Sequence, residues 1–240
     1  MYPTPRGTNL YRLGGPGEGL QQLRTPLAGT ITAIGLGAAS TGVAYAAAGS
    51  GLMRSRDNGA AWQVVTAPST DSIRGIALDP RNASTVYLAA GSLGVLKSTD
   101  AGTTWSQFPL EYSGADKVHL DPLMPSTVYA TGIGDGPCGF SSYRSDDGGQ
   151  TWTYLQKAFV NAIVPDASSL GVVYGGAYLP GPPGDREYRL ERSTDRGETW
   201  TQLTMPEGCV GKEVISDPVR RPEPRVTPMV LRPSSPLPAT

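Results

Sequence analysis

The sequence Ser98-Thr99-Asp100-Ala101-Gly102-Thr103-Thr104-Trp105 decides the fold, because its pattern Ser-x-Asp-x-Gly-x-x-Trp occurs four times in the chain. The other copies begin at Ser55, Ser145 and Ser193, and a basic residue precedes every one of the four serines. Successive copies of the aspartate are 43, 47 and 48 residues apart. A period of this length indicates a repeat architecture in which each copy marks one structural unit.

Each copy has the composition of a tight turn between two β-strands. An aspartate in this position accepts hydrogen bonds from backbone N–H groups, and the glycine permits a backbone angle that other residues avoid. The tryptophan adds a large apolar side chain at the start of the next strand. Four carbohydrate-stacking tryptophans or four catalytic aspartates are the functional alternative, but a residue repeated in every unit favours a structural role. The expected structural residues are Ser55, Asp57, Gly59, Trp62, Ser98, Asp100, Gly102, Trp105, Ser145, Asp147, Gly149, Trp152, Ser193, Asp195, Gly197 and Trp200.

The motif resembles the Asp-box, or BNR repeat, of sialidases, xyloglucan-cutting glycoside hydrolases, sortilin-type receptors and photosystem II assembly factors. The resemblance covers residues 9–218. It implies an all-β Asp-box β-propeller in which the motif joins the third and fourth strands of a blade, away from the ligand face. These families share the motif without sharing a function, so the resemblance predicts the fold and leaves the activity open.

The spacing of the motif divides the chain into four complete four-stranded blades with partial blades at each end. A tyrosine recurs in the second strand of every complete blade, flanked by small and β-branched residues that suit a buried strand. The expected segments are a flexible N-terminus (1–8), a degenerate Asp-box hairpin (9–24), four blades (31–65, 73–108, 117–155 and 161–203), a partial blade (213–218) and a Pro-rich tail (219–240).

The two partial blades allow two architectures. They pair with each other and close a five-bladed ring, or they end an open arc that belongs to a larger propeller. The proline-rich sequence after residue 218 favours the arc, because proline at that density does not form a central strand. The expected partners therefore include missing blades or a second copy of the chain.

Composition excludes several classes of function. The net charge is −1, so neither nucleic acid nor an anionic membrane surface is an expected partner. Residues 31–48 carry no charge, but they align with two strands of the next blade, and no membrane span is expected. The first thirty residues show no signal-peptide pattern, although the resembling families are often extracytoplasmic, so the compartment stays open.

Candidate site residues lie in the loops opposite the Asp-box turns, where propellers bind their ligands. Asp116 and Asp135 are the catalytic candidates, because a pair of carboxyl groups suits glycoside hydrolysis. No metal and no cofactor are expected, since the sequence contains no cluster of metal ligands and no phosphate loop. The candidates for ligand binding are Glu111, Tyr112, Tyr178, Asp185 and Arg186.

These patterns favour a non-catalytic propeller that presents a face to a protein or a glycan. The alternative is a glycoside hydrolase, sialidase-like or xyloglucanase-like, or a fragment of one; a photosystem II assembly factor-like protein is a third hypothesis. The Arg-Ile-Pro sequence that resemblance to a sialidase implies is absent. The xyloglucan-cutting enzymes place two aspartates across a cleft between two propellers, and 240 residues are too few for two propellers.

Overall fold

The computed structural model describes residues 10–13, 19–67, 71–111, 114–134, 140–155, 160–180 and 186–204. These residues form five antiparallel sheets and one short 3-10 helix. Four of the sheets have four strands each, with neighbours that follow one another in the chain, and the fifth is a two-stranded hairpin. The all-β propeller with four complete blades is therefore confirmed.

The strands follow the order of the chain. The N-terminal hairpin consists of β1 (Leu10–Leu13) and β2 (Leu20–Leu23). Blade 1 contains β3 (Ile31–Leu36), β4 (Ala44–Ala48), β5 (Gly51–Ser55) and β6 (Gln63–Val65), with η1 (Ala39–Thr41) between its first two strands. Blade 2 contains β7 (Gly75–Asp79), β8 (Asn82–Ala89), β9 (Val95–Ser98) and β10 (Ser106–Phe108). Blade 3 contains β11 (Lys117–Leu120), β12 (Val128–Ile133), β13 (Phe140–Ser145) and β14 (Thr153–Tyr154). Blade 4 contains β15 (Val160–Pro165), β16 (Val173–Pro180), β17 (Arg186–Ser193) and β18 (Thr201–Leu203).

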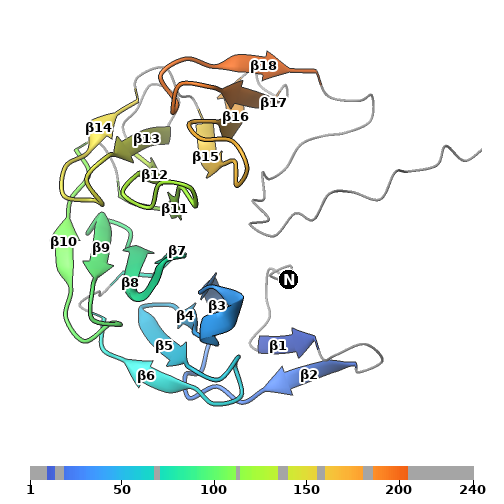
Figure 1. Cartoon of the computed structure of the whole chain (residues 1–240), viewed down its shortest axis with the longest axis vertical. Coiled ribbons are helices and arrows are strands. Elements are labelled where there is room, and N and C mark those ends of the chain that lie inside the picture. Colours follow the sequence, from blue (N-terminus) through green and yellow to red (C-terminus); the bar gives the residue numbers. More distant parts are fainter. Residues whose placement is uncertain are drawn as a thin grey trace, which may run out of the picture.

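The sheets stand side by side in an arc, with the first strand of each blade at the inner side and the fourth at the outer side (Figure 1). The β1–β2 hairpin lies at one end of the arc and blade 4 at the other (Figure 1). Within the described ranges, no strand of the hairpin pairs with a strand of blade 4. The predicted closing segment 213–218 lies outside the described residues, as do 1–8 and 219–240.

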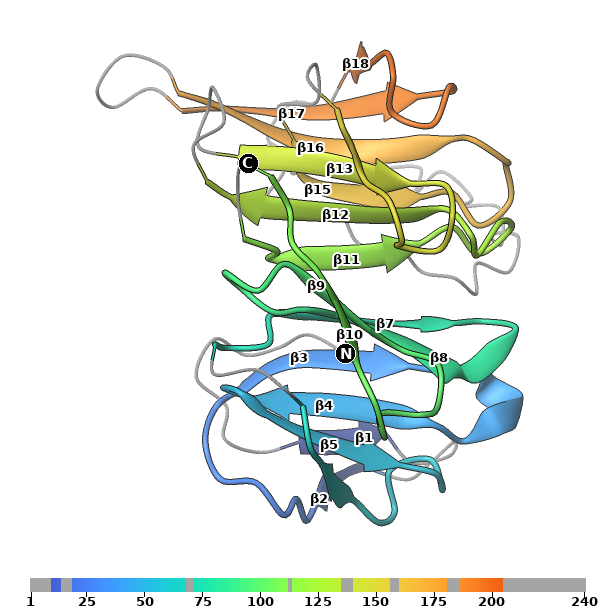
Figure 2. The ribbon, with the colours of Figure 1, turned by 90° about the vertical axis from the view of Figure 1, so that its left-hand side faces the viewer.

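The two ends of the blades carry different loops. At one end, each Asp-box turn lies beside the connection between the first two strands of its blade, as the hydrogen bond from Gly148 N to Ser126 O (2.7 Å) shows for blade 3. At the other end lie the turns between the second and third strands and the connections between blades, which we call the loop face. Figure 2 shows the blades from the side, with β16 and β17 extending farthest on the loop face.

Small and apolar residues of the second strands fill the space between blades. Tyr45, Tyr87 and Tyr129 are 0%, 2% and 0% exposed, and each packs in a cluster that joins its blade to the next one. The uncharged run at residues 31–48 forms β3, η1 and β4, as the alignment with blade 2 predicts. In the described part of the chain, no helix has the length and apolar character that a membrane crossing requires.

The Asp-box turns share one network of hydrogen bonds. In the second copy, Ser98 Oγ donates to Asp100 Oδ1 (2.8 Å) and accepts from Gly102 N (2.8 Å). Asp100 Oδ1 also accepts from Thr104 N (2.8 Å), and Thr104 Oγ1 donates to Asp100 Oδ2 (2.6 Å). The third and fourth copies repeat all of these bonds, whereas Ala61 of the first copy has no hydroxyl to donate. The carboxylate therefore holds the turn closed in every blade.

The Asp-box tryptophans are half-buried and cover the outer edges of the core. Trp62, Trp152 and Trp200 donate their Nε1–H to the glycine carbonyl of their own turn at 3.0–3.1 Å. Trp105 differs, because its Nε1–H donates to Thr66 O in the connection that leaves blade 1, at 3.1 Å. The second tryptophan thus joins two blades, which its sequence context does not predict.

We expect acid to destabilise the propeller through the Asp-box carboxylates. Hydrogen bonds lower the pKa of Asp100 and Asp195 to about 2, chiefly those from the Thr104 and Thr199 hydroxyls, and the pKa of Asp147 is also lowered, chiefly by the Thr151 hydroxyl. A lowered folded-state pKa adds stability above the unfolded pKa of about 4, and this stability is lost as the pH falls through the folded pKa. The melting temperature should therefore decrease between about pH 4 and pH 2, whereas an unchanged melting temperature across this range would contradict the network.

Candidate functional site

A polar hollow opens on the loop face between blades 2 and 3, with a volume of about 610 Å³. Three segments converge on it: the connection from β6 to β7, the turn from β8 to β9 and the connection from β10 to β11. The end of β12 completes it. The lining residues are Asp71, Ser72, Arg74, Gly91, Ser92, Gly114, Ala115, Asp116 and Ile133.

Two glycines let the backbone segments approach each other closely enough to form this hollow. Gly91 and Ala115 exchange two backbone hydrogen bonds of 3.0 and 2.8 Å, which form an antiparallel bridge between the blades. A Cβ at Gly114 would lie 2.5 Å from Gly91 O, so any larger residue there would push the two segments apart. Gly91 itself has a φ of 54°, in the left-handed region that favours glycine.

An ion pair and two hydrogen bonds link the segments that line the hollow. Arg74 Nη1 and Asp116 Oδ1 form an ion pair of 3.2 Å, with 51% and 28% of the two side chains exposed. Ser92 donates to Asp71 Oδ2 from its backbone N (3.0 Å) and from Oγ (2.5 Å). These bonds, first that of the hydroxyl, lower the pKa of Asp71. Ile133 adds an apolar surface, since it is 59% exposed.

This combination suits a ligand with many hydroxyl groups. Carboxylates accept hydrogen bonds, the guanidinium donates them, and an apolar side chain beside them contacts the C–H face of a sugar ring. Glycoside hydrolysis needs in addition a carboxyl group that is protonated at working pH. Asp71 does not meet this requirement, because its lowered pKa keeps it ionised at neutral pH. The described lining therefore shows groups for binding more clearly than groups for cleavage.

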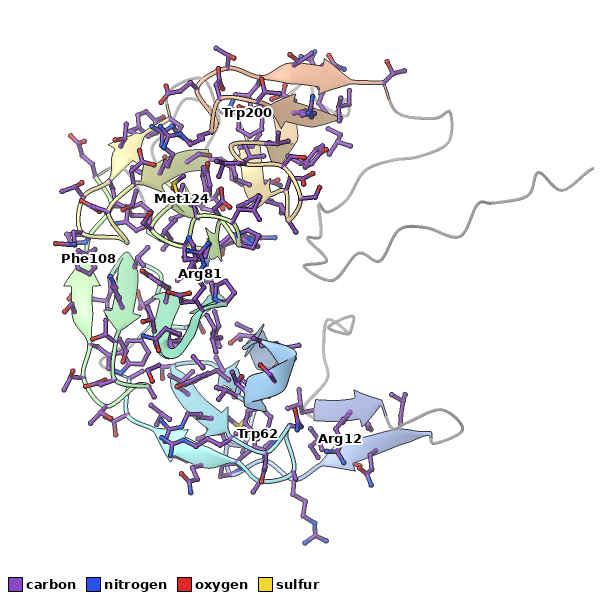
Figure 3. All side chains as sticks on the ribbon, viewed as in Figure 1. Arg12, Trp62, Arg81, Phe108, Met124 and Trp200 are labelled. Carbon is purple, nitrogen blue, oxygen red and sulfur yellow. The ribbon has the colours of Figure 1, made fainter. Side chains whose placement is uncertain are left out.

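The structure separates two of the predicted candidates. Asp116 lines the polar hollow, whereas Glu111 lines a second hollow of about 200 Å³ at the outer edge of blades 2 and 3. That second hollow has an aromatic lining that includes Phe108, Trp152 and Tyr154, and Figure 3 shows Phe108 on the outer side of the arc. Glu111 and Asp116 therefore line two separate hollows.

The remaining candidates belong to other loops. Tyr178 lies in β16 opposite Tyr188, and Arg186 begins β17 opposite Pro180, so both lie in the long hairpin of blade 4. Tyr112, Asp135 and Asp185 lie outside the described residues.

Sequence reasoning missed several lining residues. Asp71, Ser92 and Arg74 belong to connections that follow no repeated sequence pattern. Only Arg74 could have been noticed in the sequence, because it stands directly before β7. His119, the single histidine, lies in β11 opposite Tyr129 rather than in the hollow. Burial and the nearby Lys117 lower the pKa of His119 to about 4, so the ring is neutral at pH 7.

Comparison with known proteins identifies relatives for the middle of the chain. The family model of Sortilin-Vps10 (sortilin, neurotensin receptor 3) matches residues 50–170, about half of the chain. A xyloglucanase of Hypocrea jecorina is 33% identical over 115 residues, which are 48% of this chain and 14% of that protein. The xyloglucanase Xgh74A of Acetivibrio thermocellus is 29% identical over 177 residues, 58% of this chain and 20% of that protein. The chain thus spans a fifth or less of these two relatives.

Solved structures of similar fold include GH74 enzymes. The Niastella koreensis GH74 enzyme superposes with a TM-score of 0.59 and 24% identity over 74% of this chain and 30% of that one. An ancestral GH74 enzyme superposes with a TM-score of 0.57 and 18% identity over 85% of this chain and 30% of that one. At these identities the structures support the propeller fold and carry no argument about activity.

Proposed function

The chain belongs to the Sortilin-Vps10 family of Asp-box propellers, and we propose that its loop face binds a β-glucan chain of the xyloglucan type. The hollow between blades 2 and 3 is the centre of the proposed contact. The observation that carries the proposal is the Arg74–Asp116 ion pair beside Ser92 and the exposed Ile133, which offers donors, acceptors and an apolar surface together. The choice of a β-glucan among glycans is supported by the two xyloglucanase relatives.

Hydrolysis of the bound glycan is the second candidate, and the same relatives favour it. It requires a pair of carboxyl groups, for which we propose Asp116 and Asp135; in the sequence, Asp135 follows the hollow-lining Ile133 by two residues. The chain covers only 14% and 20% of the length of these two relatives, so cleavage has to be tested on this chain directly.

Calorimetric titration with xyloglucan oligosaccharides tests the binding proposal. We expect saturable binding by the wild-type chain, and binding weaker by about tenfold in Asp116→Asn and Arg74→Gln, because each loses a charged hydrogen-bonding group. Arg56→Gln is the matched control, since Arg56 is exposed, lies between Ser55 and Asp57 of the first Asp-box turn and does not line the hollow, and this variant should bind like the wild type. The proposal is wrong if titration of the wild-type chain gives no saturable binding, or if Asp116→Asn binds the oligosaccharide as tightly as the wild type does.

Release of reducing sugar from xyloglucan separates cleavage from binding. Turnover that Asp135→Asn abolishes without weakening binding would support the carboxyl pair. Binding without turnover would support the scaffold function alone.

A further inference from the structure

A basic side chain ties each blade to the Asp-box turn of the following blade. Arg54, the residue before the first Asp-box serine, donates from Nη1 to Ala101 O in the second Asp-box turn. Lys97 Nζ donates to Gly148 O in the third turn at 2.6 Å, and Arg144 Nη1 donates to Arg196 O in the fourth turn at 3.0 Å. The acceptor is always the residue directly after the Asp-box aspartate.

The N-terminal hairpin makes the same contact. Arg12 of β1 donates from Nη1 to Asn58 O in the first Asp-box turn at 3.4 Å. Figure 3 shows Arg12 on this hairpin, next to the part of blade 1 that carries Trp62. The contact therefore recurs at four successive junctions although the hairpin has lost the serine, aspartate and tryptophan of the motif.

The backbone of the turn explains why its carbonyl is available. The four acceptor residues have left-handed backbones, with φ of 57° at Asn58, 57° at Ala101, 70° at Gly148 and 61° at Arg196. In this conformation the carbonyl does not join the ladder of its own hairpin, and it accepts from the preceding blade instead. A tyrosine supports the contact at two junctions: Tyr87 Oη donates to Gly148 O at 2.9 Å and Tyr129 Oη to Arg196 O at 3.4 Å.

Blade 4 has the basic side chain that makes this contact in the other blades, but among the described residues no further Asp-box turn follows it to accept the bond. Arg192 precedes the fourth Asp-box serine and stands opposite Tyr174, as Arg144 stands opposite Tyr129 in blade 3. Within the described residues, the Arg192 guanidinium has no hydrogen-bond or ion-pair partner. Tyr174 is half-buried where its three counterparts are buried, and it supplies a minor hydrogen bond to Asp166, whose pKa is lowered mainly by Ser168.

We propose that Arg192 and Tyr174 form a docking position for the Asp-box turn of a further blade. The partner is an Asp-box turn in which the residue after the aspartate has a left-handed backbone. The carbonyl of that residue would accept a hydrogen bond from the Arg192 guanidinium. Continuity with the four existing junctions identifies this occupant, since a basic side chain donates to the same turn at all four of them and a tyrosine hydroxyl adds a bond at two. Residues 205–240 contain no Ser-x-Asp-x-Gly-x-x-Trp sequence.

Titration of the full chain with a cyclised, fluorescent peptide of residues 95–108 tests the proposal, because this peptide is the chain's own Asp-box hairpin. We expect saturable binding by anisotropy, and binding weaker by roughly tenfold or more in Arg192→Gln, which loses a charged hydrogen bond. Arg192→Lys should retain the binding, because Lys97 makes the equivalent contact at another junction. A peptide with Asp100→Ala should bind weakly, because its turn is not held closed.

Two controls make the outcome decisive. Arg56→Gln removes an exposed arginine elsewhere and should bind like the wild type. Thermal melting of Arg192→Gln without peptide shows whether the chain is still folded, and Arg192→Lys supplies a folded comparison. The proposal is overturned if the wild type shows no saturable binding up to about millimolar peptide, the range of weak complexes, or if Arg192→Gln binds as tightly as the wild type.

Discussion

Tyr129→Ala is expected to lower the free energy of unfolding by about 3–5 kcal/mol, as truncation of a buried aromatic side chain does. The ring is fully buried between blades 3 and 4, in a cluster with Leu155, Val160 and Ile163. It lies against the fourth Asp-box turn, where a Cβ added to Gly197 would be 4.0 Å from the ring. The cavity left by alanine lies between two sheets that are each held by their own hydrogen bonds, so neither sheet collapses into it easily.

Equilibrium denaturation by urea measures this loss. Tyr129→Phe is the matched control, because it keeps the ring and removes only the long hydroxyl bond to Arg196 O, at a cost of about 1 kcal/mol or less. If Tyr129→Ala unfolds at the same urea concentration as the wild type, the second-strand tyrosines do not hold adjacent blades together.

Arg144→Met is expected to destabilise the chain by about 2–4 kcal/mol, because it removes a buried guanidinium together with its charge-assisted hydrogen bonds. Arg144 is 7% exposed and bonds to Arg196 O (3.0 Å), Glu198 Oε1 (2.8 Å) and Asp146 Oδ2 (3.1 Å). The two carboxylates are 56% and 45% exposed and regain water in the variant, so the loss should remain below that of a fully buried ion pair.

The lysine found at the equivalent place in blade 2 provides the control. Arg144→Lys should lose less than half as much stability as Arg144→Met, because an ammonium group there reaches the turn carbonyl as Lys97 does. Denaturation of both variants at low and high salt would show a salt-dependent part from the carboxylates. An Arg144→Met chain as stable as the wild type would contradict the account of how blades are joined.

The sequence predicts the blades well because their signals are local. The turn at Asp100 needs only residues within four positions, and its carboxylate accepts a bond from a backbone N–H group as predicted. The two bonds of the Ser98 hydroxyl were not predicted. The second-strand tyrosines are also visible as a repeat, and three of the four are buried as expected. Because the motif repeats, the strands and turn assigned in one copy can be checked against those in the others. For this reason even the degenerate hairpin at Arg12 is recognisable in the sequence.

The site was less predictable because its residues meet only in three dimensions. Asp71, Ser92 and Asp116 come from three connections that carry no common pattern, and the bridge between Gly91 and Ala115 brings them together. Glu111 and Asp116 are close in the sequence, yet they line different hollows. The inter-blade contacts have the same character: the basic residue before each serine repeats in the sequence, but its acceptor lies in the following unit.

Hydrogen–deuterium exchange with and without a xyloglucan oligosaccharide tests most directly whether the loop face is the ligand face. The account predicts slower amide exchange at residues 71–74, 91–94 and 114–116, which surround the polar hollow, with no change at the Asp-box turns. Protection confined to the Asp-box turns, or protection nowhere under saturating ligand, would contradict it.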